Sequence, residues 1–233
     1  MSETLSIRNL TSGYGGAIVL DDVSLGVGTG RISALIGRNG VGKSTLLKTV
    51  MGFLPARRGS VTVGGEEVTR VAPNRRAEQG IAYAPQEKAL FQDLSVRDNL
   101  RLGIRSDAEF DRRFVAAEEA FPFLASRFHQ RAGSLSGGEQ KMLIVARGIM
   151  AEPRLFMLDE VTEGLQPSVI ERLGTVLRSL RDRTGVSILL VEQHLPFVMS
   201  VADDFAVMKG GQVAASGPMG PEAQGAIEEA MRF

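Results

Sequence analysis

A glycine-rich run at residues 37–45 carries the strongest chemical signal in the sequence, because it fits the pattern Gly-x-x-x-x-Gly-Lys-[Ser/Thr]. A triphosphate needs many backbone N–H donors at close range, and glycines remove the side chains that would block its approach. The lysine then brings a positive charge to the β- and γ-phosphates, and the hydroxyl that follows it is a ligand for Mg²⁺. A helix that begins here offers its N-terminus to the same anion. The run predicts a nucleotide site formed by Gly37, Asn39, Gly40, Gly42, Lys43, Ser44 and Thr45.

Two carboxylates follow an apolar segment at residues 155–158, which places them at the end of an expected buried strand. Asp159 is expected to hold Mg²⁺ there, directly or through water. Glu160 is expected to activate the attacking water as general base. A buried acidic pair would otherwise be costly, and a metal-bound triphosphate explains it.

A second motif, at residues 135–140, contains Ser136-Gly137-Gly138 just before a helix expected over 139–151. The serine hydroxyl and the unobstructed N–H groups predict a second anion site. Ser-Gly-Gly alone would favour an ordinary helix cap. The full hexapeptide, placed between the glycine-rich run and the acidic pair, favours the anion site instead.

The segments around these motifs predict an α/β fold with a P-loop NTPase core, in which helices flank a mixed or parallel sheet. Residues 4–27 alternate apolar and polar side chains and predict an antiparallel β subdomain. Residues of about 87–150 predict a helical subdomain inserted into the core, within a single domain that spans residues 1–233. The other expected elements are strands at 31–36, 60–63, 81–83 and 186–191, helices at 45–51, 167–182 and 195–202, and two short strands near 204–215.

The composition of the 233-residue chain excludes several kinds of protein. Its 27 Lys and Arg balance 27 Asp and Glu, so we expect no nucleic-acid partner. The absence of cysteine fits a cytosolic setting. The N-terminus shows no signal-peptide pattern, and the most apolar stretches, such as 186–191, are too short to span a bilayer. Any membrane role is therefore expected to depend on a partner.

The three motifs, in this order and spacing, resemble those of the nucleotide-binding subunit of an ATP-binding cassette (ABC) transporter, and the resemblance covers nearly the whole chain. It implies an enzyme that hydrolyses ATP with Mg²⁺. It also implies a sandwich, in which the glycine-rich run of one subunit faces Ser136 and Gly138 of another across the nucleotide.

The resemblance assigns roles to residues outside the motifs. Tyr14 matches the family's aromatic residue that stacks on adenine. Gln86 matches the glutamine that reaches Mg²⁺ and the attacking water, which adds it to the metal ligands Ser44 and Asp159. The stretch 87–99 is similar to the surface that receives the coupling helices of the membrane subunits.

Finer matches at residues 80–86, 162–168 and 190–193 are similar to the ATPases of the branched-chain amino acid, amide and urea uptake group. The run from 163 to 170 leans towards the urea-type member. No transported substrate can be read from these residues.

The chain departs from the family at three positions. Most relatives have histidine where Gln193 stands, and His194 comes one residue later. A neutral amide can donate a hydrogen bond to the γ-phosphate but cannot carry a proton. We predict that Gln193 occupies this catalytic, phosphate-sensing position and that His194 points away. Gln166 stands where many relatives have aspartate. Val161 replaces the usual proline, and for this change we expect a local geometric effect.

The partners implied by the resemblance are membrane-spanning permease subunits, a second ABC ATPase subunit and, indirectly, a periplasmic or extracellular substrate-binding protein. We expect a heterodimer of two different ATPase subunits, with a homodimer as the alternative. The expected location of the pair is the cytoplasmic face of the inner (plasma) membrane. A lipid or lipopolysaccharide export ATPase would share all the core motifs. A soluble, non-transport ABC ATPase acting on DNA or ribosomes would need a long coiled-coil insertion or a second cassette, and the sequence shows neither.

Overall fold

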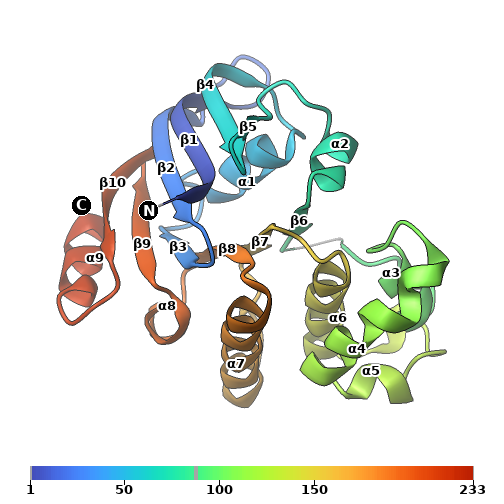
Figure 1. Ribbon diagram of the computed structural model, residues 1–233. Helices are drawn as coiled ribbons and strands as arrows, with labels where there is room; N and C mark the ends of the chain where they lie inside the picture. The colour runs from blue at the N-terminus through green and yellow to red at the C-terminus, as the bar shows by residue number, and fades with distance from the viewer. Residues whose placement is uncertain (1, 87–88, 233) are drawn as a thin grey trace.

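The computed structural model describes residues 2–86 and 89–232, and in this part of the chain two β-sheets form the centre of the molecule (Figure 1). The strands of the larger sheet follow the order β10 (Gln212–Pro218), β9 (Asp204–Lys209), β3 (Ile32–Ile36), β8 (Ser187–Glu192), β7 (Leu155–Asp159) and β6 (Ile81–Ala84). The strands from β9 to β6 are parallel, and β10 pairs antiparallel with β9 at one edge.

The central strands β3 and β7 are apolar because they are covered on both faces, and every residue in them is buried. The carboxyl ends of parallel strands meet at one edge of a sheet. The glycine-rich run after β3 and the acidic pair at the end of β7 therefore lie at the same edge, with β8 between them.

The smaller sheet is antiparallel and contains β2 (Leu20–Gly28), β1 (Glu3–Ser12), β4 (Ala56–Val63) and β5 (Glu66–Glu67), in that order. Its apolar face packs on helix α1 (Lys43–Met51) and on one face of the larger sheet. Leu5 and Ile7 of β1 share this cluster with Leu46 of α1 and Met157 of β7. The α/β architecture and the antiparallel sheet predicted from residues 4–27 are confirmed.

Helices α6 (Gly137–Met150) and α7 (Pro167–Thr184) cover the other face of the larger sheet, where Leu143, Phe156, Leu173 and Ile188 share one apolar cluster. Helices α8 (Leu195–Val201) and α9 (Ala223–Met231) pack near the β9–β10 edge. Three further helices gather around α6, at the right of Figure 1, and are α3 (Val96–Arg101), α4 (Phe110–Ala120) and α5 (Phe123–Ser126).

Within the expected helical subdomain, residues 95–133 fold as short helices separated by turns, with 3₁₀ segments at Asp107–Glu109 and Ala132–Ser134. Two short helices were missed. They are α2 (Pro73–Glu78), which is too short for a clear apolar period, and α9. The expected start of the helical subdomain, Glu87, lies outside the described residues, so its extent stays a prediction.

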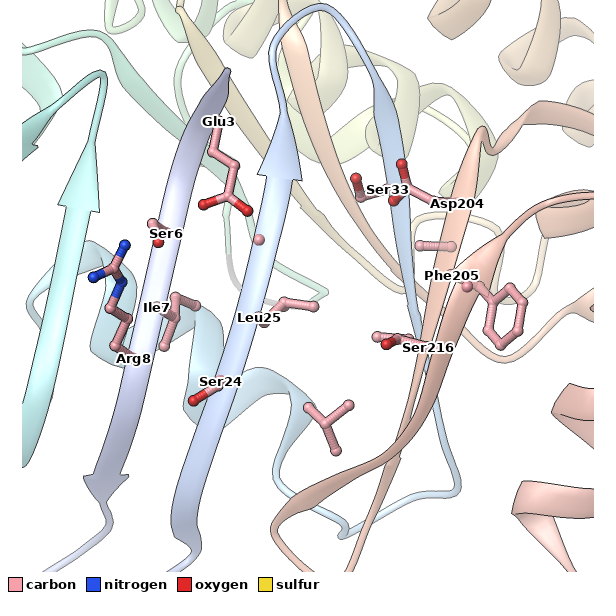
Figure 2. A pocket seen from close by; sticks show the side chains of 15 residues that line it. Glu3, Ser6, Ile7, Arg8, Ser24, Leu25, Ser33, Asp204, Phe205 and Ser216 are labelled. Atoms are coloured by element: carbon pink, nitrogen blue, oxygen red, sulfur yellow. The ribbon is translucent and has the colours of Figure 1, made fainter. Parts of the chain in front are cut away.

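The two sheets separate near the β9–β10 edge and leave a cavity of about 530 Å³. Figure 2 shows Ser6 on β1 and Leu25 on β2 on one side, with Ser33 and Asp204 on the other. Ser33 is near the amino end of β3, so the cavity lies at the opposite end of this strand from the glycine-rich run.

Arg76 secures the C-terminal end of α1. Its side chain is buried, and its guanidinium donates hydrogen bonds to the carbonyl oxygens of Thr49 at 2.9 Å and Val50 at 2.6 Å. It also bonds the carbonyl oxygens of Thr69 at 2.9 Å and Val71 at 2.8 Å. One side chain thus ties the end of α1 to the segment before α2, and the other end of α1 carries the glycine-rich turn.

Replacing Arg76 by alanine is expected to lower the free energy of unfolding by about 3 kcal/mol, because it leaves several buried carbonyl groups without their charged donor. Arg75→Ala is the matched control, since Arg75 is exposed and pairs with Glu78 on its own helix. The control should change stability by no more than about 0.5 kcal/mol. Urea denaturation measures both, and equal effects would contradict the role given to Arg76.

Candidate functional site

The turn between β3 and α1 has a backbone that favours glycine. Gly40 and Gly42 have φ of 82° and 109°, a region that residues with a Cβ rarely adopt. A Cβ on Gly37 would lie 2.6 Å from the carbonyl oxygen of Met208. Helix α1 begins directly after this turn, with Gly42 as its N-cap. The turn therefore provides the side-chain-free approach to a helix N-terminus that a phosphate group needs.

Lys43 points back across this turn, and only 4% of its surface is exposed. Its Nζ donates hydrogen bonds to the carbonyl oxygens of Gly37 at 2.8 Å and Arg38 at 3.0 Å. The same atom lies 3.1 Å from Oε1 of Glu160. The lysine of the glycine-rich run and the predicted general base are thus in direct contact.

Asp159 is buried at the end of β7, beside the first turn of α1. Ser44 donates a hydrogen bond to its Oδ1 at 3.2 Å, and the Tyr83 hydroxyl donates to its Oδ2 at 3.1 Å. Burial raises the pKa of Asp159, and the bonds from Ser44 and Tyr83 act in the opposite direction. Ser44 and Asp159 form a pair of hard oxygen donors, which fits a Mg²⁺ ion that also binds phosphate oxygens.

Glu160 accepts contacts from three separate segments of the chain. Besides Lys43, Nε2 of Gln86 lies 3.1 Å from its Oε2, and Nε2 of Gln193 lies 2.8 Å from its Oε1. The backbone of Glu160 is left-handed, with φ of 47°. Gln86 also bonds the carboxylate of Glu163 at 2.7 Å, so this predicted metal ligand lies on the Glu160 side of the site.

Gln193 also connects Glu160 to the glycine-rich turn, because its Nε2 lies 2.6 Å from Oδ1 of Asn39. His194 is the exposed residue directly before α8. The structure therefore brings Gln193 into contact with Glu160, the predicted general base. Its part in sensing the γ-phosphate stays a prediction.

Several of these side chains line a cleft of about 450 Å³, and its described lining does not include Asp159 or Gln193. Tyr14 stands in its wall and is 46% exposed, with the ammonium of Lys48 6.0 Å from the centre of its ring. An exposed ring in this position is available for stacking on a planar base. The predicted residues that line the cleft are Tyr14, Asn39, Gly40, Gly42, Lys43, Ser44, Thr45, Gln86 and Glu160.

Ser136 and Gly138 do not reach this cleft. They line a separate cavity of about 340 Å³ together with Gly164 and Gln166. Ser136 is the N-cap of α6 and forms a capping box with Glu139, whose Oε2 accepts the serine hydroxyl at 2.8 Å. One chain therefore presents the two predicted anion sites on different surfaces.

The profile of the ABC transporter family matches residues 20–163 of the chain. The chain belongs to this family. BraG of Pseudomonas aeruginosa, a high-affinity branched-chain amino acid transport ATP-binding protein, is 37% identical over 211 residues, which cover 90% of each chain. LptB of Escherichia coli K12, a lipopolysaccharide export system ATP-binding protein, is 33% identical over 222 residues, which cover 92% of this chain and 90% of LptB.

The fold comparison agrees with the family. A solved structure of an ATP-binding cassette of an ABC transporter in its ADP conformation superimposes with a TM-score of 0.88 at 26% identity, over 98% of this chain and 96% of the other. Family and fold together identify the protein as an ATPase that binds ATP.

Two residues that support the candidate ATP site were not identified from the sequence. Tyr83 bonds Asp159, and burial raises the pKa of its hydroxyl, as does the neighbouring carboxylate. Glu192 is buried and accepts hydrogen bonds from the N–H of Thr162 at 2.9 Å and from its hydroxyl at 2.8 Å. Burial also raises the pKa of Glu192. A signal for Glu192 was present, because it follows an apolar strand just as Asp159 does.

The departure at Val161 has a structural explanation, because its side chain is buried in the apolar cluster beneath α6. Gln166 is the N-cap of α7, and its side chain makes no cap bond.

Lys43→Ala is expected to weaken MgATP binding by the isolated chain about 10- to 100-fold, because a hydrogen bond from a charged donor contributes about 1.5–3 kcal/mol. Arg183→Ala removes one positive charge at the exposed end of α7 and should leave the affinity unchanged. Titration calorimetry measures both, and equal affinities for wild type and Lys43→Ala would refute the phosphate site.

Gln193→Ala is expected to reduce ATP turnover more than His194→Ala, because only Gln193 contacts Glu160 and Asn39. Loss of one neutral hydrogen bond should cost about 0.5–1.5 kcal/mol, or a few-fold in rate. Steady-state turnover of the two variants in the assembled complex provides the comparison. A silent Gln193→Ala beside an inactive His194→Ala would show that the histidine is the sensor.

Proposed function

We propose that this ABC ATPase powers an importer for branched-chain amino acids, urea or short amides. The observation that carries the enzymatic part is the convergence of Lys43, Gln86 and Gln193 on the carboxylate of Glu160, next to Asp159. The likeness to BraG over most of both chains supports the substrate class.

The contacts of the site assign a task to each residue. A bound triphosphate competes with Glu160 for Lys43, since a phosphate group carries more negative charge than a carboxylate. Glu160 is then free to take a proton from the water that attacks the γ-phosphorus, while Gln86 and Gln193 keep it in place. The water oxygen bonds to phosphorus as the bond to the ADP oxygen breaks, which releases ADP and phosphate.

Mg²⁺ would be held by Ser44 and Asp159, with Gln86 on the water side, and when bound it neutralises charge on the phosphate oxygens. Tyr83 orients Asp159 from the side opposite Ser44, since each donates to a different carboxylate oxygen. The metal site and the general base are thus adjacent but separately held.

The working unit is proposed to be a head-to-tail pair of ATPase chains. Ser136 and Gly138 line a different cavity from the phosphate site, so a second chain is needed to bring an anion to them. The pair is preferably a heterodimer, because the related uptake group often combines two different ATPases, and a homodimer is the alternative.

Exposed aromatic side chains support a contact with permease subunits. Phe53 and Phe91 are both more than half exposed. Phe91 falls in the stretch 87–99 that resembles the coupling surface, whose first two residues lie outside the described part of the chain. The ring of Phe53 lies 6.3 Å from that of Tyr83, which bonds Asp159. A permease that contacts Phe53 would therefore touch a ring that lies next to a partner of Asp159.

The proposed location is the cytoplasmic face of the inner (plasma) membrane, with a substrate-binding protein acting through the permease. In the described segments, no helix combines the length and the apolar composition needed to cross a bilayer.

Export of lipid or lipopolysaccharide is the second candidate, favoured by the likeness to LptB. Deleting the gene and measuring uptake of labelled leucine, urea and acetamide separates the two. Import predicts loss of uptake of at least one compound and its return with the wild-type gene but not with Lys43→Ala. Normal uptake of all three together with a surface-lipid defect would favour export.

Glu160→Gln is expected to bind ATP but to hydrolyse it on the order of 10²- to 10⁴-fold more slowly, because the amide keeps the shape and loses the base. The variant should accumulate as an ATP-bound dimer, which light scattering measures. Glu171→Gln, on the exposed face of α7, is the control and should turn over normally. Near-normal turnover by Glu160→Gln, or full activity in a monomer at any concentration, would contradict the proposal.

A further inference from the structure

Lys141 joins the helix that carries Ser136 to the turn that carries Glu160. It lies in the second turn of α6, and its side chain is only partly exposed. Its Nζ donates hydrogen bonds to the backbone carbonyl oxygen of Glu160 at 3.4 Å and to that of Glu163. One ammonium group thus bridges α6 and the segment that follows β7.

The carbonyl oxygen of Glu160 also accepts the backbone N–H of Glu163 at 3.4 Å, so Lys141 is its second donor, at a residue whose backbone conformation is unusual. A left-handed φ of 47° is rare for a residue with a side chain. Strand β8 holds the other side of the turn. The N–H of Glu160 donates to the carbonyl oxygen of Val191 at 2.9 Å, and Thr162 donates to the carboxylate of Glu192. Lys141 supplies the contact on the side that faces α6. The direction of the Glu160 carboxylate follows from this backbone.

The carboxylates near the turn partly counteract the effect of burial on the pKa of Lys141. Burial lowers the pKa of Lys141, and the negative charges of Glu163, Glu192 and Glu160 act in the opposite direction. Gln86 approaches the same turn from the other side and bonds the carboxylates of Glu160 and Glu163. The turn is therefore held between α6 and the segment after β6.

We propose that Lys141 is a positioning residue that transmits occupancy of the Ser136 anion site to the general base Glu160 of the same chain. A phosphate group of the nucleotide held by the partner subunit would bind at the N-terminus of α6. A shift of the helix then moves Lys141 and, through the two carbonyl groups, the turn that aims Glu160. Each ATP helps to align the base of the opposite site, which couples the two hydrolysis reactions. This inference rests on the proposed ATPase pair.

Lys141→Met tests the inference in the assembled transporter, because it keeps the length of the side chain and removes the ammonium group. We expect kcat to fall on the order of 10- to 100-fold, the effect of a small misplacement of a catalytic group. The Hill coefficient for ATP should fall towards one, and the affinity of the isolated chain for MgATP should stay unchanged. Lys141→Arg keeps a cation with several donors and should retain most of the rate.

The matched control is Arg147→Met, which removes a cation from the same helix where it packs against Gly103. It should keep both the rate and the cooperativity of the wild type. Wild-type kcat and cooperativity in Lys141→Met would overturn the inference. So would a loss of rate in Lys141→Met that tracks a loss of thermal stability and is not restored by arginine.

A double-mutant cycle with Glu160→Gln separates positioning from general damage. If Lys141 acts through Glu160, adding Lys141→Met to Glu160→Gln lowers the residual hydrolysis no further. Independent, multiplying losses would show that Lys141 does not act through the base and would overturn the inference. Failure of the proposed function itself has a different signature, because Glu160→Gln alone would then retain its turnover.

Discussion

A buried positive charge at the end of the glycine-rich turn is the constraint on which the rest of the site depends. The side chains of Lys43 and Glu160 are 4% and 7% exposed and lie 3.1 Å apart. Breaking such a pair by removing one partner typically costs about 3–5 kcal/mol, because the remaining charge stays buried without compensation. The acidic end of β7 must therefore meet the turn after β3. Three features keep Glu160 beside Lys43. They are the strand order with β8 between β3 and β7, the left-handed backbone at Glu160 and the two amides around its carboxylate.

Features that depend on neighbouring residues were accessible from the sequence. The positions of the glycines, the apolar strand before Asp159 and the start of α1 are local patterns, and the structure contains each of them. Two such patterns assigned Ser44 and Asp159 to Mg²⁺, which stays a prediction, and the structure shows a hydrogen bond between the two side chains.

Most contacts between residues far apart in the sequence could not be predicted from local patterns. Gln193 and Asn39 are 154 positions apart, and Tyr83 and Asp159 are 76 apart. Such pairs meet only because β8 and β6 flank β7, an order that does not follow the chain. The residues 136–138 allowed both a helix cap and an anion site, and the structure shows the cap bond of Ser136.

The amides around Glu160 have a consequence for the conditions under which the enzyme works. The carboxamide of Gln193 contacts one oxygen of the Glu160 carboxylate, and the carboxamide of Gln86 contacts the other. A carboxamide neither gains nor loses a proton in the physiological range, whereas an imidazole does. Lys43, Gln86 and Gln193 contact the carboxylate of Glu160. The two glutamines therefore stay uncharged when the pH changes. The two amides therefore keep their hydrogen-bonding capacity over the pH range in which an imidazole would change its charge.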